Sequence, residues 1–282
     1  MRASVLSSVL LLLHGVAATG GRGGHSAGGG GKDCSVVDAS IVAHTGTPVG
    51  REVVYKNITI YISTPDEKDA RAKARSKTAV LYLTDVFGIP LNQNKLLVDS
   101  FARAGYLTIA PDLFKGEPAP ADINAPGGAF NVTDFLLKNG EASVDPIIDA
   151  TVEYINTKLK VAKIAVTGYC FGGKYAFRHV GAGKKGDVAF TAHPSMLTDA
   201  EISGVKKPAA VAAAETDNTL TPAQRLNLEA KLSESKQPFR VSLYSGTAHG
   251  FAVRANISDP IQKFGKEEAF LQAVRWFDHW LI

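Results

Sequence analysis

Short apolar runs rich in β-branched residues alternate with longer amphipathic stretches from about residue 53 to the end of the chain. The short runs are typical of buried strands and the longer stretches of helices, so their alternation predicts a mostly parallel sheet covered by helices on both faces. We therefore expect a single α/β domain with its binding site at the carboxyl ends of the strands. The expected strands are Ala79–Leu83, Tyr106–Ala110, Ile164–Thr167, Ala189–Ala192, Ala209–Ala214 and Arg240–Tyr244.

The remaining elements follow from periodicity and from turn residues. Val53–Ile62 alternates with period two, which predicts an edge strand or one arm of a hairpin. Residues 115–129 are rich in proline and glycine and predict a long surface loop. The expected helix at Asp145–Leu159 begins with Asp-Pro, a favourable cap and first-turn pair. The other expected helices are Asn94–Ala104, one that ends at Val180, Pro222–Ser233 and Glu267–Leu281.

The amino-terminal part of the chain differs in composition from the rest. Residues 1–19 predict a secretory signal peptide, because Arg2 precedes an apolar core that is too short to span a bilayer. Residues 20–45 are rich in glycine and are expected to be a flexible segment, which leaves residues 46–282 as the folded domain. We expect secretion, or a cytoplasmic protein if the first segment is not a functional signal. Asn57, Asn131 and Asn256 are potential glycosylation sites on the secretory route.

Charge and cysteine content exclude several classes of function. The net charge is only +4 and the basic residues are scattered, so a nucleic-acid partner is not expected. Two cysteines, Cys34 and Cys170, cannot form a four-cysteine zinc site, and no histidine pair at i, i+4 supplies other ligands. We expect no metal, no cofactor and no stable membrane insertion.

The segment Gly168–Gly173 carries the strongest local signal, because it follows an expected strand and opens an expected helix. This is the pattern of a nucleophile elbow with Cys170 in place of serine, and the glycines two positions to either side allow its strained turn. The helix dipole favours a thiolate there, and the N–H of Phe171 is the first candidate donor to an oxyanion. The alternative is an inert buried cysteine packed beside glycines.

A cysteine nucleophile needs a base and an acid that orients the base. His249 lies in a glycine-rich turn just past the last expected strand, whereas His179 and His279 lie in expected helices. Asp217 follows the strand before it and is the preferred acid, with Glu215 and Asp199 as competitors.

One more carboxylate is expected at the same rim of the sheet. Asp85 follows the strand Ala79–Leu83, where the N–H of Val86 or Phe87 could complete an oxyanion hole. The alternative is that Asp85 only caps a turn.

Together these segments resemble the dienelactone hydrolases, α/β-hydrolase enzymes with a Cys-Asp-His triad. The resemblance implies that Cys170 is the nucleophile, His249 the base and Asp217 the orienting acid, with Phe171 and Val86 supplying the oxyanion N–H groups. The matching segments, in the family's order, are Asp85–Gly88, Pro111–Phe114, Gly168–Gly173, Glu215–Asp217 and His249–Phe251.

The resemblance also assigns two residues that modulate the site or bind substrate. In the family an acidic residue at the position of Asp85 contacts the resting cysteine. The bacterial members bind a substrate carboxylate with two arginines. Here Arg254 stands one residue away from one of those positions, and no arginine occurs between Arg103 and Arg178 to replace the other.

The predicted function is hydrolysis of a small-molecule ester or enol lactone through a thioester on Cys170. Two alternatives remain open: a hydrolase of another ester, polyketide or glycan-linked, with the same triad, and a catalytically silent secreted protein that keeps the fold. The oligomeric state is not predicted.

Overall fold

The computed structural model describes residues 38–123 and 130–282. The predicted signal peptide, most of the predicted flexible segment and Cys34 lie outside the described residues, so those predictions stay untested. Residues 38–45 differ from the expectation of flexibility, because Val42 is buried and the N–H of Ala43 donates to Ser100 Oγ at 3.0 Å. The apolar side chains at the end of the glycine-rich segment gain enough burial to hold it against the domain.

The described residues form an eight-stranded sheet with the order β1-β2-β4-β3-β5-β6-β7-β8. β1 and β2 are antiparallel and form a hairpin, β2 is antiparallel to β4, and all other neighbours are parallel. The predicted fold class is therefore confirmed. The strands are β1 (Arg51–Tyr55), β2 (Ile58–Ser63), β3 (Thr78–Leu83), β4 (Leu107–Pro111), β5 (Lys163–Tyr169), β6 (Val188–Ala192), β7 (Ala209–Thr216) and β8 (Phe239–Ala248).

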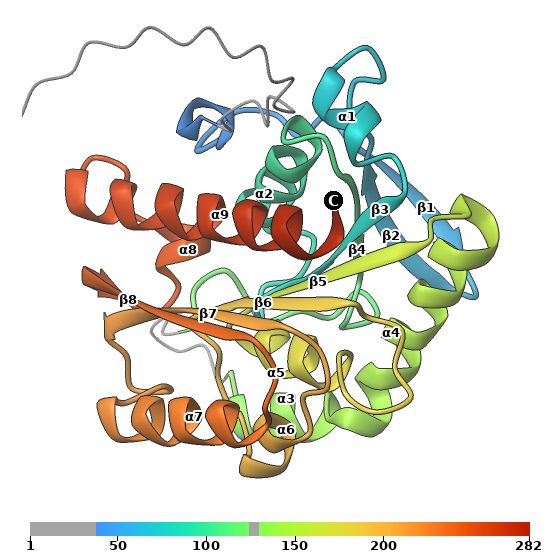
Figure 1. Ribbon diagram of the computed structural model, residues 1–282. Helices are drawn as coiled ribbons and strands as arrows, with labels where there is room; N and C mark the ends of the chain where they lie inside the picture. Colours follow the sequence, from blue (N-terminus) through green and yellow to red (C-terminus); the bar gives the residue numbers. More distant parts are fainter. Residues whose placement is uncertain (1–37, 124–129) are drawn as a thin grey trace, which may run out of the picture. The chain divides into compact units, whose positions relative to one another are not determined.

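Helices cover both faces of this sheet (Figure 1). The helices α2 (Asn92–Arg103), α8 (Phe251–Arg254) and α9 (Pro260–Leu281) pack on one face. The other face carries α3 (Val132–Lys138), α4 (Glu141–Tyr154), α5 (Phe171–Arg178), α6 (Asp199–Ser203) and α7 (Pro222–Glu234). Shorter elements are the 3₁₀-helix η1 (Ala39–Ile41), α1 (Ala70–Ala74) and the π-helix η2 (Ile155–Leu159).

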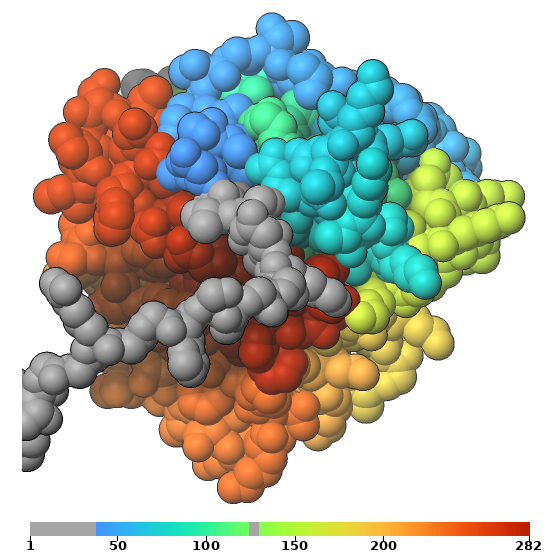
Figure 2. All heavy atoms as spheres, turned by 45° about the horizontal axis from the view of Figure 1, so that its top comes forward, coloured from blue at the N-terminus to red at the C-terminus, as the bar shows by residue number. Residues whose placement is uncertain are grey.

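The face turned forward in Figure 2 brings the segment that starts at residue 38 and the α1 region next to α9. Two contacts hold these parts together: His44 Nε2 lies 2.8 Å from Glu267 Oε1 in a hydrogen bond, and Arg75 Nη2 lies 2.7 Å from Asp278 Oδ2 in an ion pair. In residues 38–123 and 130–282, no helix has both the length and the hydropathy that a bilayer crossing requires.

Two predicted helix starts are wrong, and both concern an Asp-Pro pair. α4 begins at Glu141, so Pro146 lies inside the helix rather than in its first turn. The lost backbone hydrogen bond is tolerated because α4 buries Val144 and Ile148 against the sheet. By contrast, α9 begins seven residues earlier than predicted, at Pro260, with Asp259 as its cap.

The parallel strands β3, β5, β6, β7 and β8 all end at the same edge of the sheet. The four inner strands are buried along nearly their whole length, which fixes their register and therefore the height at which each chain leaves the sheet. Residues that follow these strands are consequently held close together.

Candidate active site

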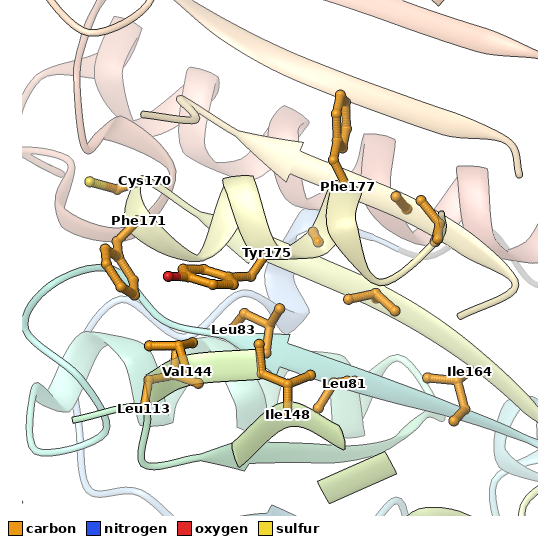
Figure 3. Close-up of a cluster of buried hydrophobic side chains, with 14 of the residues drawn as sticks. Leu81, Leu83, Leu113, Val144, Ile148, Ile164, Cys170, Phe171, Tyr175 and Phe177 are labelled. Carbon is orange, nitrogen blue, oxygen red and sulfur yellow. The ribbon is translucent and has the colours of Figure 1, made fainter. Parts of the chain in front are cut away.

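Cys170 occupies a sharp turn between β5 and α5, with φ 51° and ψ −112°, a conformation that non-glycine residues rarely adopt. A Cβ on Gly168 would lie 2.2 Å from the carbonyl oxygen of Gly172, and one on Gly172 would lie 2.2 Å from that of Leu83. Both glycines are thus required by close backbone approach, as the sequence predicts. Figure 3 shows the Cys170 sulfur directed away from the aliphatic side chains beneath α5, whereas Phe171 points toward them.

His249 and Asp217 complete a line of three side chains with Cys170. The Nε2 of His249 lies 3.0 Å from Cys170 Sγ, and its Nδ1 donates to Asp217 Oδ2 at 2.9 Å. β8 extends to Ala248, so His249 follows the strand directly rather than lying in a loop several residues beyond it. The other oxygen of Asp217 accepts hydrogen bonds from the backbone N–H groups of Thr219 and Leu220.

The competing acids are engaged elsewhere. Glu215 accepts a hydrogen bond from the N–H of Gly246 at 2.7 Å, which ties β7 to β8. Asp199 lies on the surface, where it pairs with Lys231 at 3.1 Å. Of the three carboxylates considered, the structure therefore brings Asp217 to His249.

The charges of the site reinforce one another. Burial lowers the pKa of His249, but hydrogen bonds and charges from Asp217 and Cys170 outweigh it and raise the pKa to about 10. Burial likewise opposes the ionised form of Asp217, yet the hydrogen bonds from His249 and Thr219 hold its pKa below the usual value. At neutral pH the imidazole is therefore a cation between two groups that favour a positive charge.

The two backbone N–H groups predicted to bind an oxyanion belong to Phe171 and Val86. Within the described residues, neither the N–H of Phe171 nor that of Val86 has a hydrogen-bond acceptor. The N–H of Gly172 donates to the carbonyl oxygen of Thr84 at 3.0 Å, which ties the start of α5 to the end of β3. This contact links the segments that carry the two free donors.

Asp85 and Arg254 contact each other rather than the cysteine. Asp85 is fully buried; it accepts from Asn94 Nδ2 at 2.9 Å, and Arg254 Nε lies 3.4 Å from its other oxygen. Burial raises the pKa of Asp85, while Asn94 and Arg254 oppose that rise. The expected contact of Asp85 with Cys170 is not among the hydrogen bonds of the described residues, because Asn94 draws the short carboxylate toward α2.

The loops after β6 and β7 contribute residues for which the sequence predicts no role. Ser195 Oγ lies 3.5 Å from Cys170 Sγ. His193 is fully buried, and its ring packs edge-to-face on that of His249 with centroids 5.0 Å apart. Thr219, after β7, lies 3.0 Å from His249 Nδ1. The only feature of the sequence that could indicate a role for these residues is their position just after the carboxyl ends of buried strands.

A pocket of about 450 Å³ opens onto Cys170 and His249. Its polar residues include Arg254, Asp122 and Ser195. The apolar part of its wall includes Val86, Phe87, Ile123, Phe130, Phe135, Leu136 and Met196. No group of three metal-ligating side chains occurs in the described part of the chain.

Known proteins share the sequence and the fold of this chain. The model of the dienelactone hydrolase family matches residues 59–281. Hydrolase pyvD of Aspergillus violaceofuscus is 35% identical over 238 residues, which cover 84% of this chain and 93% of that protein. Hydrolase tropI of Talaromyces stipitatus is 37% identical with the same coverage. A putative dienelactone hydrolase from Klebsiella pneumoniae has a similar fold, with a TM-score of 0.64 at 15% identity over 82% of this chain and 98% of its own.

Proposed function

The chain belongs to the dienelactone hydrolase family, and from that premise we propose that it cleaves an ester or lactone through a thioester on Cys170. The observation that carries the proposal is that His249 contacts both Cys170 and Asp217. Its Nε2 lies 3.0 Å from Cys170 Sγ, and its Nδ1 lies 2.9 Å from Asp217 Oδ2. A nucleophile in contact with a base, which is in turn oriented by an acid, is the arrangement that acyl transfer requires.

In the first step the Cys170 thiolate attacks the carbonyl carbon of the substrate. A C–S bond forms, and the carbonyl electron pair moves onto oxygen, where the N–H groups of Phe171 and Val86 donate to it. The bond to the leaving oxygen then breaks, and that oxygen takes the proton from His249 Nε2. An enol leaving group departs readily, which suits a thiolate nucleophile.

In the second step water hydrolyses the thioester, and this requires a neutral His249. The charge and hydrogen bond of Cys170 are among the causes that hold the pKa of His249 at about 10. Acylation removes that negative charge, so the pKa of His249 falls when the imidazole must act as a base. His249 accepts a proton from water, the new C–O bond forms, the C–S bond breaks, and the thiolate and imidazolium are restored.

The pocket favours an ester without a carboxylate as the second candidate substrate class, such as a polyketide-derived ester. Most of the wall is apolar, and the guanidinium of Arg254 already lies beside Asp85 and over the ring of Phe87 at 4.4 Å. A substrate carboxylate would have to compete for that single guanidinium, whereas two arginines would form a stronger clamp.

Hydrolysis of an activated aryl ester by the wild type and by Cys170→Ala tests the proposal. We expect the variant to lose turnover while its circular dichroism spectrum stays unchanged. Equal turnover by both proteins rejects the Cys170 mechanism, and an inactive wild type favours a silent protein. A panel of lactones and esters with and without a carboxylate then decides between the two substrate classes.

A further inference from the structure

We propose that Ser195 holds the sulfur of Cys170 in its ionised form by donating a hydrogen bond to it. The inference deepens the proposed function, on which its catalytic meaning rests. Ser195 Oγ lies 3.5 Å from Cys170 Sγ, and this is the only hydrogen bond of the hydroxyl among the described residues. A thiolate has no proton to donate, so in the ionised site the hydroxyl must be the donor.

The hydroxyl is held in place from several sides. The N–H of Ser195 donates to the carbonyl oxygen of Cys170 at 3.1 Å, and the N–H of Cys170 donates to that of Ala192 at 3.2 Å. These two bonds clamp the β6 loop to the elbow. A Cβ on Gly173 would lie 2.8 Å from that of Pro194, so the loop also presses against the start of α5.

Backbone strain in the same loop supports a functional role. His193, two residues before Ser195, and Met196, directly after it, have φ values of 39° and 58°, and non-glycine residues seldom adopt such angles. Ser195 itself is only 6% exposed. Strain of this kind persists where the surrounding contacts require it, and here those contacts aim one hydroxyl at the reactive sulfur.

The hydrogen bond favours the thiolate over the thiol. A hydroxyl donating to an anion forms a charge-assisted bond, whereas a thiol donating to a hydroxyl forms a weak one. Ser195 therefore acts together with the imidazolium of His249, 3.0 Å from the same sulfur. Between catalytic cycles the two donors keep the sulfur ready for attack. Ser195 touches a reacting atom and is thus a further catalytic residue of the proposed reaction.

The test is alkylation of Cys170 by iodoacetamide as a function of pH, quantified on the Cys170 peptide so that Cys34 does not contribute. Only the thiolate reacts, so the rate reports the ionised fraction without any turnover. For Ser195→Ala we expect rates about 10-fold lower along the acidic limb of the profile, because a hydrogen bond to a charged group is lost. On the plateau the rate should stay within about twofold of the wild type.

Ser245→Ala is the matched control, because its exposed hydroxyl contacts Glu215 and not the sulfur; its profile should match the wild type throughout. An unchanged profile for Ser195→Ala, or one lowered equally at every pH, overturns the inference. Ser195→Gly also removes the hydroxyl while it keeps the backbone N–H, and it carries the same prediction if the alanine variant does not fold. Since alkylation needs no substrate, failure of this test is distinct from failure of Cys170→Ala to lose turnover.

Discussion

Gly172→Ala probes how tightly the elbow is built into the sheet. The new Cβ would lie 2.2 Å from the carbonyl oxygen of Leu83, where ordinary contact begins at 3.4 Å. The start of α5 must therefore move by about 1 Å, which separates the N–H of Phe171 from that of Val86. A displacement of that size near reacting groups costs about 100-fold in rate.

The same substitution should also destabilise the fold. At an open helical position Gly→Ala stabilises by about 1 kcal/mol, whereas overpacking against backbone costs about 1–3 kcal/mol. We expect a net loss of stability in urea unfolding and a loss of about 100-fold in kcat/KM for an aryl ester. Gly140→Ala is the control, since its Cβ would meet nothing closer than 3.6 Å. A Gly172→Ala variant with wild-type kcat/KM would refute the coupling of β3 to the elbow.

Three further predictions concern the environment of the base. Asp217→Asn should lower kcat by about 10²–10⁴-fold with a far smaller change in KM, since the carboxylate orients His249 and does not bind substrate; an equal change in both parameters argues against this role. Because the pKa of His249 is raised from 6.5 to about 10, its pairing stabilises the fold fully below about pH 6.5 and this contribution is lost as the pH rises through about 10. The difference in unfolding free energy between wild type and His249→Gln should therefore shrink over that range, and a constant difference contradicts the pairing. His193→Phe keeps the ring beside His249 and should retain kcat/KM within about threefold, whereas His193→Ala should lose about 10-fold because the base gains room to move; similar losses in both variants would mean that the nitrogens of His193 matter.

The site residues that the structure brings together are marked in the sequence by local features. Gly168 and Gly172 flank a single cysteine between a strand and a helix, and each of these features is visible in a short stretch of sequence. The structure also brings His249 and Asp217 together with Cys170, because buried parallel strands end at one edge of the sheet. Alternation of strand and helix patterns was therefore enough to place them near each other.

The errors arise where tertiary packing overrides a local signal. Asp-Pro marks the true start of α9 at Asp259, but the same pair at Asp145 lies inside α4 because burial of the helix outweighs one lost hydrogen bond. The contacts of Ser195 and His193 with the triad come from the path of one strained loop, which no periodicity encodes. Asn94, from α2, likewise sets the partner of Asp85.

The identity of the nucleophile is the central claim, and the site of acylation tests it most directly. Acid quenching during turnover of an activated aryl ester, followed by peptide mass mapping, should find the acyl group on the peptide that contains Cys170. His249→Gln should slow both formation and loss of this adduct. An acyl group on another residue, or rapid turnover by Cys170→Ala without any adduct, would contradict the account.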